Sequence, residues 1–457
     1  MLCSTQEERL EDRRLNMKRI GFDFTENTRI SDWQMMNVAG KLGDEIDNVR
    51  MALRKGYDTR YASINLAKDD DLIRKVRVLV REKRMLKPKA LIVVGIGGSN
   101  LGTKAVHESV NGRLYNDANR GMKVYFADTP DPDKIADILG IAQKILKAGD
   151  NILVNVVTKS GQTTETIAIF ELFLRLLLKY KKKSCARLVV VTTDRDSPLW
   201  NMAVERGYSL LEIPSRVGGR YSVLSAVGLF PLAMTGLNIE RMQDGARSMI
   251  SSCTRSDVLN NPAIQSAATR YAHYRRGRNI NDLFVFATDL ESVGKWYRQL
   301  MGESLGKTWD KDHKKRIHAG ITPTVSIGST DLHSMAQLYL GGPKDKLTTF
   351  VKVTQDKSSL TMPDYDGFDE LVGKIQGRDV KHIMDAIYEG VKRAFMKAGR
   401  PFMEVILPDK SEESIAAFLQ YEMISMMYLA YLMNVDPFDQ PSVELYKKET
   451  RRILADD

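Results

Sequence analysis

Short apolar runs alternate with longer amphipathic segments through the first half of the chain. The runs lie at residues 90–94, 123–127, 152–157 and 187–192. Between residues 167 and 179, the charged positions Glu171, Arg175 and Lys179 recur every four residues on an apolar background, which predicts a helix with one solvated stripe. Continuous apolar strands separated by helices predict a parallel sheet that is covered on both faces.

A second series of apolar runs follows a helical stretch at residues 224–269. These runs lie at residues 282–288, 324–327, 347–353 and 403–406. Residues 1–84 are polar, with apolar positions such as Ile73, Val76 and Val80 at helical spacing. The pattern predicts an α/β fold with two tandem doubly wound domains of mainly parallel sheet. We expect a helical N-terminal arm at residues 1–84 and domains at 85–260 and 261–457, with C-terminal helices in the second.

Length, composition and charge agree with an ordinary folded protein. The 457 residues are 43% hydrophobic and 28% charged, close to globular averages. At roughly 150 residues per domain, this length corresponds to two or three domains. The net charge of +10 favours anionic partners, but the basic clusters at 179–183, 275–278 and 311–316 lie far apart and match no nucleic-acid-binding motif. These clusters are more typical of solvated helix ends and turns, and we expect no nucleic acid partner.

The cysteines and the apolar stretches bear on the location of the protein. Cys3, Cys185 and Cys253 lie far apart without a C-x-x-C pair, which favours free thiols in a reducing compartment and gives no zinc-ligand spacing. Residues 1–14 are polar, so we expect no secretory signal. Polar residues such as Glu422 interrupt the apolar stretch 415–435, which favours a buried core helix over a membrane span. We therefore expect a cytoplasmic protein without a membrane segment.

A glycine-rich turn directly follows the first apolar run. It reads Gly-Ile-Gly-Gly-Ser-Asn-Leu-Gly from Gly95 to Gly102 and includes Gly98 and Ser99. Glycines let backbone N–H groups approach an anion, and the N-terminus of the next helix adds a favourable dipole. A dinucleotide fingerprint would need glycine at Asn100, and a P-loop would need lysine directly after the last glycine. The turn favours an anion other than a nucleotide, with a merely tight strand-to-helix turn as the alternative.

A hydroxyl-rich turn follows the third apolar run and leads into the predicted helix. Its residues are Thr158, Lys159, Ser160, Gly161, Gln162 and Thr163. Hydroxyls can donate to phosphate oxygens while the amides at a helix start point at the anion. A hydroxyl-rich helix cap is the alternative, but one cap needs only one such residue. The turn therefore favours a phosphate cradle.

Four further segments carry candidate chemistry, although each is weak alone. Arg220 follows a Gly-Gly turn and offers a fixed positive charge for an oxyanion or a phosphate. Glu303 and Lys307 stand four residues apart near a predicted helix end, which is typical of an exposed ion pair. His333 follows a capping-type turn, where a structural hydrogen bond is the simple explanation. Lys447 is one more lysine near the C-terminus.

Taken together and in this order, the motifs resemble those of the phosphoglucose isomerase family. Besides the two turns, they are Gly-Gly-Arg-Tyr-Ser at 218–222, Gln-x-x-x-Glu-Ser-x-Gly-Lys at 299–307, Asp-Leu-His-Ser at 331–334, and Phe-Asp-Gln followed by Val-Glu-x-x-Lys at 438–447. The resemblance spans residues 95–447. It implies two sugar isomerase (SIS) α/β domains, a homodimer, no metal or organic cofactor, and interconversion of glucose 6-phosphate and fructose 6-phosphate.

The resemblance also implies a role for each matching residue. Glu303 matches the base that moves a proton between C2 and C1, and Arg220 matches the residue that stabilises the cis-enediolate. Lys447 and a His333 supplied by the neighbouring subunit match the groups that open the sugar ring. The residues that would bind the substrate are Gly98, Ser99, Thr158, Lys159, Ser160, Gly161, Gln162, Thr163, Gln299 and Gln440. Elementary chemistry agrees, since a carboxylate can take a carbon-bound proton only if the developing negative charge is stabilised.

Departures from the family's common forms bear on substrate range. Gly302 stands where a larger residue is usual, Leu305 where Asn is frequent, and Thr158 replaces Ser. Pro441 and Ser442 stand where Gly commonly precedes Val-Glu. These changes leave the catalytic groups intact.

Alternatives to the glucose-specific enzyme stay open. Gln440 stands where dual phosphoglucose/phosphomannose isomerases tend to have Thr, so we favour strict glucose specificity over a dual enzyme or an isomerase of another sugar phosphate. A non-catalytic SIS protein that senses sugar phosphates is a third possibility. It is disfavoured because the chain keeps Glu303 and His333 and shows no helix-turn-helix appendage.

Overall fold

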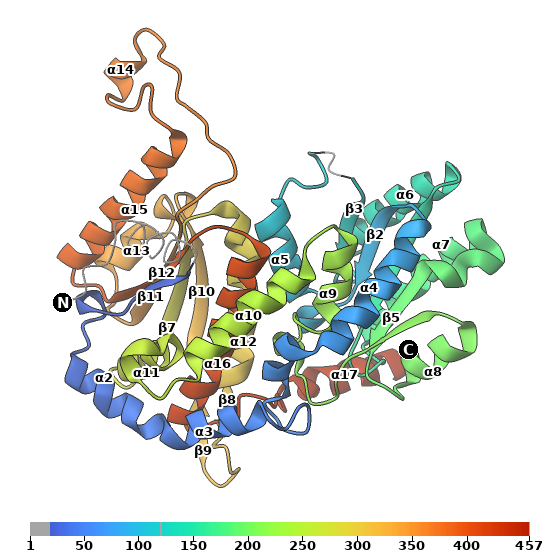
Figure 1. Ribbon diagram of the computed structural model, residues 1–457, viewed down its shortest axis with the longest axis horizontal. Coiled ribbons are helices and arrows are strands. Elements are labelled where there is room, and N and C mark those ends of the chain that lie inside the picture. The colour runs from blue at the N-terminus through green and yellow to red at the C-terminus, as the bar shows by residue number, and fades with distance from the viewer. Residues whose placement is uncertain (1–18, 119–120, 457) are drawn as a thin grey trace, which may run out of the picture.

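The first sheet contains the apolar runs of the first series. The computed structural model describes residues 19–118 and 121–456 (Figure 1). The strands of this sheet are β2 (Pro88–Val94), β3 (Lys123–Ala127), β4 (Asn151–Val157), β5 (Val189–Thr193) and β6 (Ser209–Glu212), all parallel and in the order β3-β2-β4-β5-β6. They are connected through α5 (Leu101–Asn111), α6 (Pro132–Lys147), α7 (Thr164–Lys181) and α8 (Pro198–Arg206). Four strands were predicted from their apolar runs, and the fifth, β6, was not.

The order of these strands brings the two polar turns together. The chain moves from β2 to β3 in one direction and then returns to place β4 on the other side of β2. Such a reversal opens a crevice at the carboxyl ends of the two strands beside it. The turns after β2 and β4 are the glycine-rich turn and the hydroxyl-rich turn, so both lie at this edge.

The second sheet has the order β1-β12-β11-β7-β10. Its parallel strands are β7 (Ile280–Val285), β10 (Thr322–Ile327), β11 (Lys346–Val353) and β12 (Phe402–Leu407), and β1 (Gly21–Asp23) adds antiparallel to β12. Its connections contain α12 (Glu291–Leu305), α13 (Ala336–Gly341), α14 (Phe368–Leu371), α15 (Val380–Lys397) and a hairpin of β8 (Lys307–Trp309) and β9 (Arg316–Ala319). The prediction of an α/β fold with two mainly parallel sheets is confirmed.

A helical layer lies between the two sheets (Figure 1). It includes α9 (Ala226–Met234), α10 (Ile239–Cys253) and α16 (Glu412–Leu432), while α11 (Pro262–Tyr274) packs on α16 beside the second sheet. The N-terminal arm contributes α2 (Asp32–Ala39), α3 (Gly43–Ala52) and α4 (Asp70–Met85) around this layer, and α17 (Val443–Asp456) ends the chain. The described part of the arm is helical as expected apart from β1. The prediction for residues 1–18 lies outside the described residues.

Helix α16 is the buried core helix expected from the apolar stretch 415–435. Within the described part of the chain it is the one helix long and apolar enough to cross a membrane, and 89% of its most apolar window is buried in the protein. Its Glu422 forms an ion pair with Arg270 of α11, and both side chains are fully buried. Each guanidinium nitrogen Nη1 and Nη2 of Arg270 lies 2.9 Å from a carboxylate oxygen of Glu422.

The direction of α12 decides where two predicted site residues lie. Gly294 packs against Val325 in the middle of β10, and a Cβ on Gly302 would lie 3.9 Å from Pro323 near the start of β10. Helix α12 therefore runs antiparallel to β10, and its last turn lies at the edge of the sheet where β10 begins. The turn after β10, which includes the 3₁₀ helix η9 (Thr330–Leu332), lies at the opposite edge.

Candidate active site

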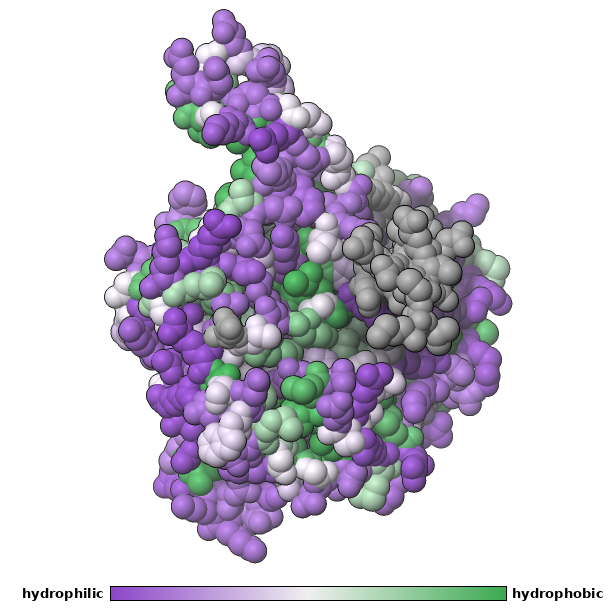
Figure 2. All heavy atoms as spheres, turned by 60° about the vertical axis from the view of Figure 1, so that its left-hand side comes forward, coloured by the Kyte–Doolittle hydropathy of each residue, from purple (hydrophilic) through white to green (hydrophobic). Residues whose placement is uncertain are grey.

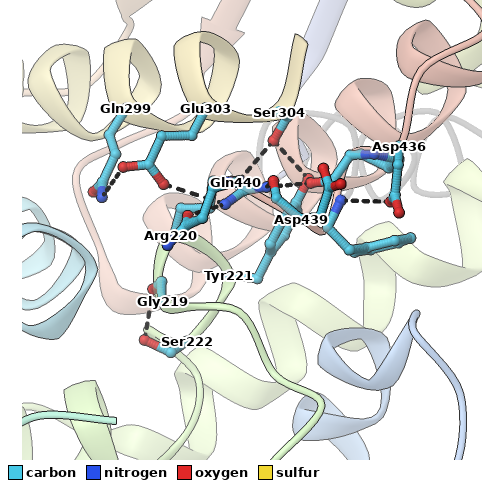
Figure 3. Close-up of polar contacts among 12 residues, drawn as sticks. Gly219, Arg220, Tyr221, Ser222, Gln299, Glu303, Ser304, Asp436, Asp439 and Gln440 are labelled. Atoms are coloured by element: carbon cyan, nitrogen blue, oxygen red, sulfur yellow. Dashed lines mark hydrogen bonds and ion pairs between the residues drawn. The ribbon is translucent and has the colours of Figure 1, made fainter. Parts of the chain in front are cut away.

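Arg220 is the buried centre of a polar network that joins three distant segments (Figure 3). It lies in the 3₁₀ helix η6 (Gly219–Tyr221), and only 1% of its side chain is exposed. Its Nη1 donates to Oε2 of Glu303 at 3.2 Å and to Oε1 of Gln440 at 2.8 Å, and its Nε donates to Oγ of Ser304 at 2.9 Å. Its Nη2 donates to the backbone oxygen of Pro437 and, at 3.3 Å, to that of Asp439. This planar cation is therefore held in one orientation before any ligand binds.

The Glu303 carboxylate is oriented by one donor on each oxygen. Gln299, one turn earlier on α12, donates from Nε2 to Oε1 at 3.0 Å, and Arg220 bonds to Oε2. The Glu303 side chain is 29% exposed and lines a cleft of about 460 Å³. The site thus presents an accessible carboxylate beside an enclosed positive charge, which is an arrangement for moving a proton while an anion forms.

The expected ion pair between the side chains of Glu303 and Lys307 is wrong. Helix α12 ends at Leu305, so Lys307 is not on the helix. Its Nζ donates to the backbone oxygen of Glu303 at 2.8 Å and lies 2.9 Å from Oδ1 of Asp439, with 5% of the side chain exposed. Burial lowers the pKa of Lys307, although the contact with Asp439 opposes this shift. Lys307 therefore ties the end of α12 to the segment that holds Gln440.

The glycine-rich turn approaches the Arg220 segment closely at Gly98. A Cβ on Gly98 would lie 2.2 Å from the carbonyl carbon of Gly219, so no residue other than glycine fits at this position. Ser222 adds a hydrogen bond from its Oγ to the backbone oxygen of Gly98 at 3.2 Å. Gly97 has a φ of +57°, and a Cβ there would lie 3.1 Å from Nε2 of Gln299. The structure thus brings the turn with Gly98 and Ser99 to the residues around Glu303, as their assignment to one site requires.

The hydroxyl-rich turn is held by its own hydroxyls and by β5. Oγ1 of Thr158 and Oγ1 of Thr163 lie 2.8 Å apart, so the Thr163 side chain makes no capping bond to α7. Thr193 on β5 donates from Oγ1 to the backbone oxygen of Thr158 at 2.6 Å. Gly161 has a φ of +69°, which favours glycine at this position. The first amides of α7 therefore face the turn without a side-chain cap, as an anion site requires.

Two ionisable groups beside this turn have shifted pKa values. Burial lowers the pKa of Lys159, and the charge of Asp194 opposes that shift. Burial raises the pKa of Asp194 to about 6, with Lys159 acting in the opposite direction. The sequence offered no signal for Asp194, which follows β5 and reaches the turn through the backbone bond from its N–H to the oxygen of Lys159 at 3.2 Å.

Lys447 lies at a second cleft, of about 170 Å³, between the hydroxyl-rich turn and α17. The residues that line this cleft are Ser160, Gln162, Thr163, Thr164, Glu165, Glu444, Tyr446, Lys447, Thr450 and Arg451. Nζ of Lys447 lies 2.8 Å from Oε1 of Glu444. The fold thus places Lys447 opposite the turn that was expected to bind phosphate.

His333 is the predicted site residue that the chain does not bring to the others. It follows η9, is exposed, and lines neither of the two clefts. Sequence reasoning also gave no role to Ser304 and Asp439, although both lie inside motifs that were singled out. Across the described ranges 19–118 and 121–456, no group of three or more His, Cys, Asp or Glu side chains is arranged as metal ligands would be.

Comparisons with known proteins agree with this geometry. The family model of phosphoglucose isomerase matches residues 82–457. Two relatives named glucose-6-phosphate isomerase are similar over most of their length: that of Carboxydothermus hydrogenoformans is 34% identical, covering 84% of this chain and 83% of the relative, and that of Bacillus anthracis is 35% identical, covering 80% of each.

Solved structures show the same fold. A hypothetical protein of Thermus thermophilus has a TM-score of 0.83 at 28% identity, covering 96% of this chain and 100% of that one. The structure of a glucose-6-phosphate isomerase from Chlamydia trachomatis has a TM-score of 0.77 at 20% identity, covering 93% of this chain and 87% of that one. With the motifs, the family model and the relatives in agreement, the chain belongs to the phosphoglucose isomerase family.

Proposed function

We propose that this protein interconverts glucose 6-phosphate and fructose 6-phosphate through a cis-enediolate. The observation that carries the proposal is the pairing of the accessible Glu303 carboxylate with the enclosed guanidinium of Arg220 at 3.2 Å. An aldose–ketose isomerisation needs a base for a carbon-bound proton and a fixed positive charge for the oxyanion that forms. Both requirements are met by groups that are already oriented, which avoids reorganisation during the reaction.

In this proposal, Glu303 takes the proton from C2 of the open-chain aldose and returns it to C1 of the enediolate. The electron pair of the C–H bond moves into the C1–C2 bond, and the negative charge collects on O1, the former carbonyl oxygen. The hydroxyl proton of O2 then moves to the neighbouring O1, so that protonation at C1 leaves a carbonyl at C2 and a hydroxyl at C1. Arg220 stabilises that charge without a proton transfer of its own, because a guanidinium stays protonated. Gln299 and Gln440 contact Glu303 and Arg220 at 3.0 and 2.8 Å, so they orient these two groups as well as line the pocket.

The phosphate of the substrate would bind at the hydroxyl-rich turn and the start of α7. Thr158, Ser160 and Thr163 supply hydroxyls, and the uncapped amides of α7 supply backbone donors. Gly98 and Ser99 at the neighbouring carboxyl end of β2 would complete the contact with the sugar phosphate. The remaining members of the turn, Lys159, Gly161 and Gln162, would contribute backbone donors and one positive charge.

Ring opening would use Lys447 and His333, with His333 supplied by the partner in a homodimer. Within one chain, Gly302, the residue before Glu303, lies beside Pro323 at the start of β10, whereas His333 follows the end of this strand. From Pro323 to Ile327 the strand alone spans roughly 13 Å. One chain therefore holds the two groups at opposite edges of the same sheet, which supports a second copy of the chain as the source of His333. Imidazole suits the step because its pKa lies near neutrality.

An exposed segment between two elements of the second domain, residues 354–379, supports this assembly. The segment between β11 and α15 carries α14 and stands clear of the rest of the molecule (Figure 2). Five of its large apolar side chains are exposed, namely Leu360, Tyr365, Phe368, Leu371 and Val372. A cluster of this kind is typical of a protein–protein interface rather than of a monomer's surface.

The proposal also keeps the finer expectations that follow from the motifs. They are a division at residues 1–84, 85–260 and 261–457, a cytoplasmic location, no cofactor, and strict use of glucose 6-phosphate because of Gln440. The alternatives are a dual phosphoglucose/phosphomannose isomerase and a non-catalytic sensor of sugar phosphates.

One coupled assay tests the proposal. Turnover of fructose 6-phosphate to glucose 6-phosphate is expected, with little turnover of mannose 6-phosphate and full activity after treatment with EDTA. Turnover of both hexose phosphates would select the dual enzyme, and phosphosugar binding without turnover would select the sensor. Sensitivity to EDTA would contradict the metal-free mechanism.

A further inference from the structure

The cleft beside the hydroxyl-rich turn contains a second cation in addition to Lys447. Arg451 follows Lys447 by four residues on α17, so the two side chains share one face of the helix. Arg451 lines the cleft together with Ser160 and Thr163, and its Nε donates to the backbone oxygen of Lys447 at 3.3 Å. The motifs that identify the family do not include this arginine.

One carboxylate bridges the two cations. Oε1 of Glu444 lies 2.8 Å from Nζ of Lys447, and Oε2 lies 3.6 Å from Nη2 of Arg451. The hydrogen bond from Lys447, followed by smaller contributions that include the charge of Arg451, lowers the pKa of Glu444. Glu444 is therefore ionised at neutral pH. With Glu165 on the facing wall, the cleft holds two cations and two carboxylates.

A phosphate group is a better partner for these cations than the carboxylate of Glu444. It carries up to two negative charges and has three terminal oxygens, and a guanidinium can bond to two of them in one plane. The opposite wall of the cleft offers the hydroxyls of Ser160 and Thr163 and the uncapped start of α7. An anion between the walls would therefore be bound from both sides, with the charge of Glu165 as the one opposing contribution from the lining of the facing wall.

We propose that Arg451 binds the phosphate of the substrate beside Lys447, which keeps its role in ring opening, and that Glu444 occupies both cations in the free protein until the phosphate displaces it. The proposal rests on the assigned isomerase activity for the identity of the substrate. It adds a phosphate-binding residue and a competing carboxylate to that site.

Arg451→Gln is tested against Arg452→Gln, which removes the same charge from the next position. Arg452 pairs with Glu449 at 3.2 Å and does not line the cleft. Arg451→Gln should raise the Kd of inorganic phosphate in calorimetry and the KM for fructose 6-phosphate about tenfold, as expected for one charge-assisted hydrogen bond, with kcat within about twofold. Arg452→Gln should change neither value. Equal effects of the two variants would overturn the proposal.

Glu444→Gln tests the competing carboxylate. Without it, inorganic phosphate should bind several-fold more tightly than to the wild type; unchanged or weaker binding would overturn this part. Arg451→Gln and Glu444→Gln both change exposed positions of α17, so circular dichroism should show an intact fold for each. The calorimetry needs no turnover. A wild type inactive on fructose 6-phosphate would therefore reject the assigned activity, while the comparison of phosphate affinities still decides the role of Arg451.

Discussion

Nη1 of Arg220 lies 3.2 Å from Oε2 of Glu303, although 83 residues separate them in sequence. The arginine is 1% exposed and the glutamate 29%, so the positive charge is enclosed and the carboxylate faces the cleft. Three partners in addition to Glu303 hold the guanidinium from behind, namely Ser304, Gln440 and the backbone of residues 437–439. The base can thus change its protonation state while the cation keeps its position.

Glu303→Gln should lower kcat by about 10³-fold or more and leave the affinity for fructose 6-phosphate nearly unchanged. The amide preserves the shape and can still accept from Arg220, but it is no base. Steady-state kinetics and calorimetry measure the two effects. Glu291→Gln, at the other end of α12 where the carboxylate pairs with Lys295 at 2.7 Å, is the matched control and should keep full activity. Near-normal turnover of Glu303→Gln would reject the assignment of the base.

Removing two hydroxyls of the phosphate turn with Ser160→Ala and Thr163→Ala should raise KM by about 10- to 100-fold with a smaller change in kcat. Phosphate contacts are largely shared by the ground state and the transition state, so they contribute mainly to binding. Ser184→Ala is the control, since that hydroxyl donates to the backbone oxygen of Lys181 at the far end of α7. An unchanged KM in the double variant would place the phosphate elsewhere.

Mixing Glu303→Gln with His333→Ala should restore activity that neither variant has alone. If the histidine comes from the partner, each mixed dimer has one site with both lesions and one site with neither. With random exchange of equal amounts, about half of the dimers are mixed, so about a quarter of the wild-type activity should return. An inactive mixture with verified subunit exchange would show that His333 serves its own chain or takes no part.

Glu422→Gln should lower the free energy of unfolding by about 3–5 kcal/mol. The substitution leaves the fully buried guanidinium of Arg270 without its counter-charge, which is more costly than the pair itself is stabilising. Urea unfolding at fixed protein concentration measures the change. Glu449→Gln removes an exposed partner of Arg452 and should cost less than about 1 kcal/mol. Similar losses in both variants would contradict the importance of the buried charge.

The free energy of unfolding should fall as the pH decreases from 6.5 to 4, in part because of His273. Burial lowers the pKa of His273 from 6.5 to about 4, and its Nε2 lies 2.8 Å from the backbone oxygen of Thr28. The unfolded chain therefore takes up a proton at a higher pH than the folded protein does, so the stabilisation is complete above pH 6.5 and is lost on acidification. The His273→Asn variant should show a smaller fall over this range; an identical fall would exclude a contribution from this residue.

The sequence by itself determined most local elements and the chemistry of the motifs. Strand β2 ends in a continuous apolar run at residues 90–94, and β4, β7 and β11 keep enough apolar residues among their polar ones to predict strands. Strands β1, β6, β8 and β9 were missed because they are three or four residues long and half exposed, so their pairing comes from distant partners rather than from a local pattern.

Local spacing also misled at one site residue. Glu303 and Lys307 have the spacing of a helical ion pair, but Gly306 takes an extended ψ of 96° and ends α12 before the lysine. Lys307 then reaches Asp439, which is 132 residues away along the chain. A spacing rule holds only while the helix continues, and this helix ends at Leu305, before Lys307.

The tertiary structure decided which of the predicted residues meet. Arg220 meets Glu303 because the turn with Gly98 packs on Gly219, and Lys447 reaches the turn after β4 because α17 returns across the first sheet's edge. The strand order and the direction of α12 place Glu303 and His333 at opposite edges of one sheet. Such relations depend on which strands pair and in which direction each crossover runs. Both are set by the free energy of contacts between residues far apart in sequence, which no short segment of the sequence reveals.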